Sequence, residues 1–280
     1  MSLKIRWLGV SSLEITTEEN IKIYMDPYLD RRVSFNPPPI LSEDIRHADL
    51  LLITHGHFDH FEDALKILKR INVKLVASKV LCDFVEKTLN IPRERLIPID
   101  YDETVKVGNL SITATKGEHT PTVDVIRWFL DDFTIQPKSR EEVIRLFQKV
   151  LPPDVLDFGF KVPVGPLQGY IIQTETGLRI WNIGETIPIE ELKTYSEKFK
   201  PQIVLIAVFS RLEERSVKIL EWVKPRIVIP HSFDKEVEKQ KAEADLEKFQ
   251  RMLKEKCPKT EVIIPKPGKT YTFDVCWKEE

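Results

Sequence analysis

The chain has 280 residues, of which 42% are hydrophobic and 31% charged, as in an ordinary globular protein with a substantial core. Its formal net charge of -2 offers no global attraction to nucleic acid or anionic membrane, and no apolar run reaches membrane-spanning length. The N-terminus lacks the apolar core of a signal peptide, and Cys82, Cys257 and Cys276 are widely spaced, so we expect a cytoplasmic protein with reduced thiols.

Three short segments near the N-terminus have strand character. Residues 3–8 and 12–15 alternate like neighbouring antiparallel strands. A third strand is predicted over 21–25, and it ends at Asp26 and Pro27. On local grounds alone, Asp26 is a turn-forming residue.

A cluster of polar side chains follows the apolar run at 49–53, which reads as a buried strand. Within six positions the chain places His55, His57, Asp59 and His60, although it has only 6 histidines in all. Apolar residues then recur at helical spacing, so a helix is predicted from here with Asp59 as its N-cap. Imidazole and carboxylate donors suit zinc, manganese or iron, and no cysteine pair suggests a closed structural site. The alternative is a solvated polar turn, which the density of donors disfavours.

The next segments alternate between strands and helices. A strand is predicted over 73–77 and a helix over 78–89, an order that implies strands covered by helices. A hairpin around Gly108 and Asn109 then runs into His119. An isolated histidine of this kind is, on its own, more often structural than ligating.

From 122 to 158 the alternation stops, and apolar residues at helical spacing predict one or two amphipathic helices. The aromatic residues Trp128 and Phe129 would pack a core in the simplest interpretation. Because the segment follows His119 directly, it can instead cap a cleft and select a substrate.

The C-terminal part returns to strands and helices. A hairpin over 169–183 ends at Glu185, a strand over 203–208 is followed by Arg211, and a strand over 227–229 leads to His231. Arg211 is either a fork for a phosphate or carboxylate, or a solvated surface residue. A charged helix over 235–256 and strands over 261–264 and 270–273 complete the chain.

The stretch at 54–60 resembles the His-x-His-x-Asp-His signature of the metallo-β-lactamase superfamily, and the later single residues occur in the order typical of that family. The resemblance implies an α/β (α+β) fold, namely a four-layered αββα sandwich. It further implies one domain over 1–280, in which 122–158 is a helical insertion that would serve as a lid. The L-ascorbate-6-phosphate lactonase-like and N-acylphosphatidylethanolamine phospholipase D-like groups are the most similar subfamilies.

The resemblance also implies a dinuclear metal centre with two divalent ions, zinc being expected and manganese or iron the alternatives. Glu185 stands where the family usually has a bridging aspartate, and Asp26 would lie beneath the site and orient a ligand histidine. The implied ligands are His55, His57 and His119 for one metal, Asp59, His60 and His231 for the other, and Glu185 as the bridge.

The function implied is metal-dependent hydrolysis of an ester, lactone or phosphodiester by a metal-bridging hydroxide, which Asp59 would help to orient. Trp128, Phe129 and Arg211 are the candidate substrate contacts. The expected partner is a small molecule, without nucleic acid or membrane, and homo-oligomerisation is left open. A nucleic-acid-processing enzyme of the same superfamily and a non-catalytic metal-binding sensor are the alternatives.

Overall fold

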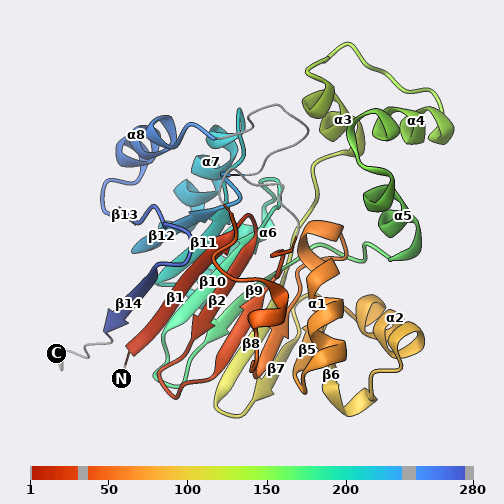
Figure 1. Cartoon of the computed structure of the whole chain (residues 1–280). Coiled ribbons are helices and arrows are strands. Elements are labelled where there is room, and N and C mark those ends of the chain that lie inside the picture. Colours follow the sequence, from red (N-terminus) through yellow and green to blue (C-terminus); the bar gives the residue numbers. More distant parts are fainter. Residues whose placement is uncertain (1, 31–36, 235–243, 275–280) are drawn as a thin grey trace.

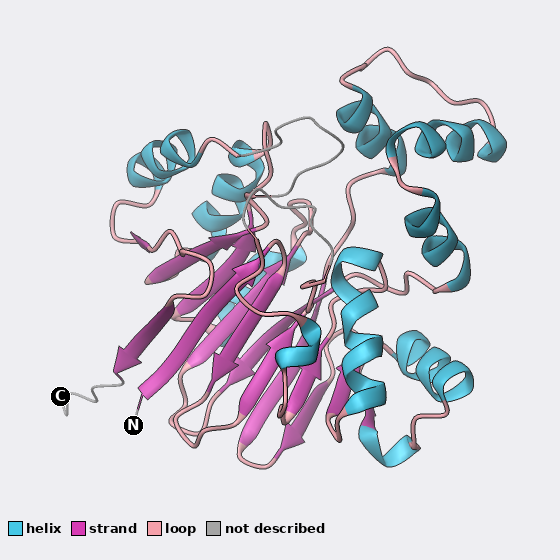
Figure 2. Cartoon of the chain, viewed as in Figure 1, coloured by secondary structure: helices cyan, strands magenta, loops and turns pink. Residues whose placement is uncertain are grey.

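The computed structural model describes residues 2–30, 37–234 and 244–274. Within these ranges the strands form two seven-stranded sheets that lie face to face, with helices on their outer sides (Figure 1, Figure 2). The αββα sandwich predicted from the sequence is therefore confirmed. Cys276 and the first part of the predicted helix over 235–256 lie outside the described residues.

The first sheet has the strand order β14-β1-β2-β3-β4-β5-β6. Strands β1, β2 and β3 pair antiparallel, as their alternation predicts, and β3 to β6 pair in parallel. The strands are β1 (Ser2–Gly9), β2 (Ser12–Thr16), β3 (Lys22–Met25), β4 (Leu50–Leu52), β5 (Lys74–Ala77), β6 (Leu96–Pro98) and β14 (Thr270–Asp274).

The second sheet has the order β13-β12-β11-β10-β9-β8-β7. Strands β7 to β10 pair antiparallel, whereas β10 to β13 pair in parallel, so β10, β11 and β12 end at one edge. The strands are β7 (Thr104–Val107), β8 (Leu110–Lys116), β9 (Gln168–Gln173), β10 (Arg179–Gly184), β11 (Ile203–Ala207), β12 (Ile227–His231) and β13 (Glu261–Val262).

The helices form two outer layers and a separate group. α1 and α2 pack against the first sheet, and α6, α7 and α8 pack against the second. None of the helices in the described ranges has both the length and the apolar character needed to cross a membrane. The helices are α1 (Phe58–Arg70), α2 (Lys79–Leu89), α3 (Thr122–Leu130), α4 (Arg140–Val150), α5 (Pro153–Lys161), α6 (Glu191–Phe199), α7 (Glu213–Val223) and α8 (Leu246–Lys256), with short 3-10 turns η1 (Ser42–Asp44) and η2 (Arg93–Arg95).

The main core lies between the two sheets and contains the fully buried side chains of Trp7, Trp181 and Tyr170. The Tyr170 hydroxyl donates to the carbonyl oxygen of Ile53 at 2.7 Å, which links β9 to the segment that follows β4. Burial raises the pKa of Tyr170 well above its ordinary value, so the hydroxyl keeps the proton it donates. This buried bond fixes the two sheets relative to each other beside the histidine cluster.

The start of α1 differs from the sequence-based expectation. His57 is the N-cap, and Asp59 lies in the first turn instead of capping it. No side chain caps this helix, because the backbone turns to present His57 and Asp59 to the cavity described below. By contrast, α2 begins as expected, with Ser78 accepting a hydrogen bond from the backbone N–H of Leu81.

The segment 122–158, which we call the insertion, contains α3, α4 and most of α5. It therefore has three helices, not the one or two predicted from apolar spacing. The chain leaves α4 at Leu151, and Pro153 occupies the first position of α5, where proline is favoured because no N–H is needed there. Figure 1 shows α3, α4 and α5 as a group that projects beside the sandwich, next to α1.

Candidate metal centre

Five polar residues of the candidate site follow, or end, strands of the two sheets. Asp26 and His55 come after β3 and β4 of the first sheet, whereas His119, Glu185 and His231 belong to the ends of β8, β10 and β12 of the second. His57, Asp59 and His60 come from the turn into α1. The site therefore lies at one edge of the sandwich and draws on both sheets.

The first group of donors consists of three imidazoles. His55 Nε2 lies 2.9 Å from His57 Nδ1 and 3.2 Å from His119 Nε2. In a tetrahedral site with zinc–nitrogen bonds of about 2.0–2.1 Å, neighbouring ligand nitrogens are about 3.3 Å apart. The two measured separations are close to this value, and all three nitrogens lie within 4.8 Å of one another, so the group can surround one cation.

The second group joins His55 with His60 and Glu185, whose donor atoms lie within 4.8 Å of one another. His60 Nε2 is buried and makes no hydrogen bond to any described residue, although Glu185 Oε1 is 3.2 Å away. A buried imidazole nitrogen at this ion-pair distance from a carboxylate is an arrangement in which both groups could also bind one cation. His55 belongs to both groups and its Nε2 can bind only one ion, so His60 and Glu185 are the donors left for a second metal.

Asp59 lies close to this second group, and His231 ends β12 at the same edge of the sandwich; neither belongs to the group. Asp59 Oδ2 is 3.8 Å from His60 Nε2, and the Asp59 backbone is held by the hydroxyl of Ser11, which donates to its carbonyl oxygen at 2.7 Å. His231 is buried, and its Nδ1 lies 3.0 Å from the hydroxyl oxygen of Ser232. The structure thus brings all seven residues predicted as ligands to one edge of the sandwich.

Asp26 lies beneath the donors and contacts Thr54 and His60. Its carboxylate accepts from the backbone N–H and the hydroxyl of Thr54 at 2.8 and 2.7 Å, and its Oδ2 lies 3.0 Å from His60 Nδ1. The Thr54 hydroxyl is in turn 3.0 Å from His55 Nδ1. One buried carboxylate therefore sets the ring orientation of His60 directly and that of His55 through Thr54.

The surroundings shift the pKa values of the histidines in opposite directions. Burial and the neighbouring imidazoles lower the pKa of His55 well below its ordinary value and that of His57 to about 4, so both are neutral at pH 7, as metal ligands must be. For His60, burial also opposes the charge, but the carboxylates of Glu185, Asp26 and Asp59 together raise its pKa well above the ordinary value. The negative charge of this half of the site thus attracts a cation.

Gly56 separates the first two histidines and allows a close backbone approach. Its N–H donates to the carbonyl oxygen of Val164 at 2.7 Å, and a Cβ at this position would lie only 2.0 Å from the carbonyl oxygen of Pro163. Glycine is therefore required where the histidine turn meets the segment that leads out of the insertion.

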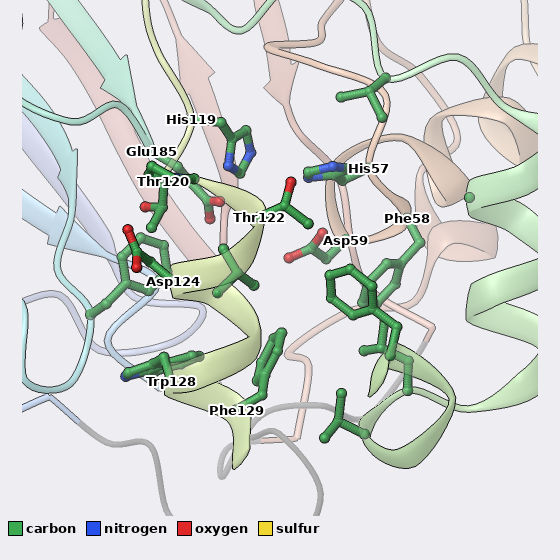
Figure 3. Close-up of a pocket in the computed structure, with 18 of the residues that line it drawn as sticks. His57, Phe58, Asp59, His119, Thr120, Thr122, Asp124, Trp128, Phe129 and Glu185 are labelled. Atoms are coloured by element: carbon green, nitrogen blue, oxygen red, sulfur yellow. The ribbon is translucent and has the colours of Figure 1, made fainter. Parts of the chain in front are cut away.

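The metal donors border a cavity of about 1280 Å³ that the insertion encloses with the sandwich edge. Figure 3 shows His57, Asp59, His119 and Glu185 at one end of it, with Trp128 and Phe129 of α3 farther along. Both aromatic residues line the cavity, and the Trp128 indole N–H donates to the carbonyl oxygen of Ser210.

The two arginines of the lining differ in their surroundings. Arg211 forms an ion pair with Asp131 at the end of α3, and its side chain is 57% exposed. Arg215 is largely enclosed, and it donates to the hydroxyl of Thr120, next to His119, at 2.7 Å. Sequence patterns did not mark Arg215, because nothing in the sequence brings it to Thr120, which lies 95 positions away. Its position in the first turn of α7, the helix after β11, was the one sequence feature that could have indicated a role at the site.

Comparison with known proteins agrees with this architecture. Residues 22–136 match the family model described as "Beta-lactamase superfamily domain". A UPF0173 metal-dependent hydrolase of Methanosphaera stadtmanae is 28% identical over 276 residues, which cover 96% of this chain and 99% of that protein. One from Archaeoglobus fulgidus is 25% identical, with 97% and 100% covered.

Among solved structures, Igni18, a metallo hydrolase from Ignicoccus hospitalis, superposes with a TM-score of 0.70 at 19% identity. The superposition covers 99% of this chain and 100% of Igni18. The chain thus has the metallo-β-lactamase fold, and over nearly its whole length it is similar in sequence to proteins named as metal-dependent hydrolases.

Proposed function

We propose that this chain of the metallo-β-lactamase fold is a metal-dependent hydrolase that cleaves an ester, lactone or phosphodiester with two divalent ions. The observation that carries the proposal is the cluster of donors at one edge of the sandwich, in which His55, His57 and His119 would bind one ion and His60 and Glu185 lie beside them for the other. Neutral imidazoles and a carboxylate are the donors of catalytic zinc sites, and manganese or iron also fits them. Zinc is the expected ion.

The location of the donors supports catalysis over a purely structural role. His57, Asp59, His119 and Glu185 line the large cavity, so a substrate can reach them. Structural zinc sites are instead closed, and their metal is surrounded by protein ligands alone. The metal-dependent hydrolases that the chain resembles give independent support for the hydrolase class.

When bound, the two ions would lower the pKa of a coordinated water and polarise the scissile oxygen. The chain's own residues supply the remaining requirements. Asp26 holds the rings of His60 and, through Thr54, His55 in fixed orientations. Asp59 is placed at the cavity wall, where its carboxylate can accept a hydrogen bond from the attacking water and so orient it.

The apolar lining favours a small or amphipathic molecule over a nucleic acid as substrate. Polyanion sites need a groove of basic residues, whereas the arginines of this lining are Arg211 and Arg215. Lactones and phosphodiesters of the kind cleaved by the lactonase-like and phospholipase D-like groups are therefore the first compounds to test.

The test combines metal analysis with a hydrolysis panel. We expect close to two divalent ions per chain, and loss of turnover of esters, lactones or phosphodiesters after chelation, with recovery on adding zinc. His57→Ala should remove one ion and abolish turnover, whereas His47→Ala, a change at an exposed histidine outside the site, should alter neither. Turnover that survives complete removal of metal would refute the proposal.

A non-catalytic sensor predicts a different result. It would retain two ions in the wild type and lose one in His57→Ala, yet show no metal-dependent turnover with any member of the panel. That outcome would leave the metal site in place and withdraw the hydrolase assignment.

A further inference from the structure

The cavity beside the metal donors is mainly apolar and large. Its volume of about 1280 Å³ exceeds the range of roughly 300–1,000 Å³ that is common for small-molecule sites. Most of its wall away from the donors comes from the insertion, including Val125, Phe129, Ile144, Phe147, Val155 and Leu156. A wall of this kind buries hydrocarbon favourably but gives polar groups few partners.

Exposed apolar side chains continue this wall outward. Within the described ranges, five large hydrophobic side chains are exposed, and three of them, Phe133, Phe160 and Val164, line the cavity. Phe133 and Phe160 are 64% and 61% exposed. Since apolar surface gathered at one place usually marks a binding region, these residues indicate that the occupant is apolar over much of its length.

The charged groups of the lining are mostly neutralised within the protein. Asp124 accepts from Arg127 at 2.9 Å, and Arg211 is paired with Asp131. Arg215 differs, because no carboxylate of the described residues lies within salt-bridge distance of it. The charges at the donor end, Asp59 and Glu185, belong to the candidate metal centre.

Arg215 is nevertheless held in a fixed position. One of its terminal nitrogens donates to the Thr120 hydroxyl, and its guanidinium lies over the Phe209 ring at 5.4 Å. Burial lowers the pKa of Arg215, and the nearby Glu185 opposes that change. A guanidinium has five N–H donors, so its bond to Thr120 leaves others for a ligand in the cavity. Thr120 directly follows His119 in the chain, and Arg215 and His119 line the same cavity, so a group bound by Arg215 would lie toward the donor end.

We propose that the substrate is an amphipathic acyl ester or lactone, whose apolar body packs against the insertion and whose acyl oxygen accepts a hydrogen bond from Arg215. The proposal rests on the hydrolase function above and specifies its substrate class. Hydrolysis adds the oxygen of water to the acyl carbon and breaks its bond to the alkoxy oxygen, which takes a proton and leaves as the alcohol. The acid product then loses a proton, and its carboxylate carries one negative charge that can pair with Arg215, which forms no salt bridge with a described residue.

A phosphodiester matches the cavity less well. Its hydrolysis gives a phosphomonoester with close to two negative charges, for which the described lining offers one guanidinium without an acidic partner. Outside the candidate metal centre, whose ions would attract either product, the charge of the lining therefore matches an acyl product better.

Binding of product analogues tests the proposal without requiring turnover. Calorimetry on the metal-loaded wild-type protein would compare decanoate with acetate, which lacks the apolar body, and with decanol, which lacks the oxyanion. We expect decanoate to bind at least roughly tenfold more tightly than either, because a charge-assisted hydrogen bond and a buried chain each contribute. Decyl phosphate serves as the analogue of a phosphodiester product.

Variants assign the contributions to individual residues. Arg215→Gln should weaken decanoate binding roughly tenfold to a hundredfold and leave decanol unchanged, because it removes the charge-assisted bond. Phe129→Ala should weaken both. Lys218→Gln, a loss of one exposed cation from the same helix, is the matched control and should change neither. If Arg215→Gln does not fold, Arg215→Lys keeps the charge without the fork and should still weaken decanoate binding.

Each contrary outcome has a distinct meaning. Decanoate affinity that is equal in Arg215→Gln and Lys218→Gln would overturn the role of Arg215. Tighter, Arg215-dependent binding of decyl phosphate would overturn the acyl class. Metal-dependent turnover of 4-nitrophenyl acetate without decanoate binding would refute this inference and keep the hydrolase function. Decanoate binding without any turnover would refute the hydrolase function and keep the binding of an amphipathic carboxylate.

Discussion

The indole N–H of Trp128 donates to the carbonyl oxygen of Ser210 at 3.2 Å, and this bond joins the insertion to the loop that follows β11. The Trp128 ring also packs edge-on near Phe209. A second connection between the same segments is the ion pair of Asp131 with Arg211, which is exposed to solvent. A partly buried hydrogen bond and an exposed ion pair therefore connect α3 and its C-terminal end to the loop after β11.

These two connections should differ in strength. Trp128→Phe removes the hydrogen bond but keeps an aromatic ring, and it should lower the free energy of unfolding by about 1 kcal/mol. It should also raise the KM of long acyl substrates. Arg211→Ala should change both quantities little, because solvent screens an exposed ion pair. Urea unfolding and steady-state kinetics measure the two effects. A larger KM effect in Arg211→Ala, confined to anionic substrates, would instead assign Arg211 to substrate binding.

In the proposed two-metal function, Glu185 would bridge the two ions. Glu185→Gln keeps the size of the side chain and removes its charge, so we expect the loss of about one metal ion per chain and of most of kcat. Metal analysis by mass spectrometry would measure the first and steady-state kinetics the second. Glu118→Gln changes an exposed carboxylate that pairs with Lys116, and it should have no such effect. A full complement of two ions in Glu185→Gln would show that Glu185 is not required to bind metal.

In a neutral His60 that binds a metal, Asp26 would accept a hydrogen bond from the proton-bearing Nδ1 and leave Nε2 for the ion. In Asp26→Asn, the new amide can direct an N–H toward His60 Nδ1, which then accepts, so the proton moves to Nε2, the atom that faces Glu185. A protonated Nε2 does not bind metal, and we expect the second ion to be held roughly 10–100-fold more weakly. Competition with a chelator of known affinity would measure this.

Asp63 provides the matched control for Asp26. Asp63 lies on α1 and is also a buried carboxylate, but it accepts from the backbone N–H groups of Leu29 and Asp30 and pairs with Lys66, not with a histidine. Asp63→Asn should lower stability and leave metal affinity unchanged. Equal losses of metal in Asp26→Asn and Asp63→Asn would point to general destabilisation.

Gly56→Ala should disrupt the turn between the first two histidines. The added methyl would lie 2.0 Å from the Pro163 carbonyl oxygen, so the backbone must move, at a cost of about 1–3 kcal/mol in the free energy of unfolding. Metal affinity should fall as well, because His55 and His57 flank the shifted residue. Gly159→Ala, where the added methyl meets nothing within 4 Å in α5, should instead stabilise the chain slightly. Thermal unfolding of the two variants side by side decides the matter.

The sequence predicted the strands well where alternation or burial is strong, as in β1, β2 and β4. It located His57, Asp59 and His60 by their density, whereas His119, Glu185 and His231 were identified through their order along the chain in a resembled family. The contact of Arg215 with Thr120 could not be predicted from the sequence, because this contact depends on how the second sheet and α7 position residues from separate segments. The third insertion helix was missed because Pro152 and Pro153 resemble a loop, although proline also begins helices.

The candidate centre takes donors from both sheets, since His55 follows β4 and His119 and Glu185 follow β8 and β10. Any ion bound there connects the two halves of the sandwich, and the halves cannot separate without releasing it. Through this linkage, each tenfold rise in free metal above saturation adds about 1.4 kcal/mol to the free energy of unfolding. The supply of metal would then govern how long the folded chain survives, in addition to how fast it reacts.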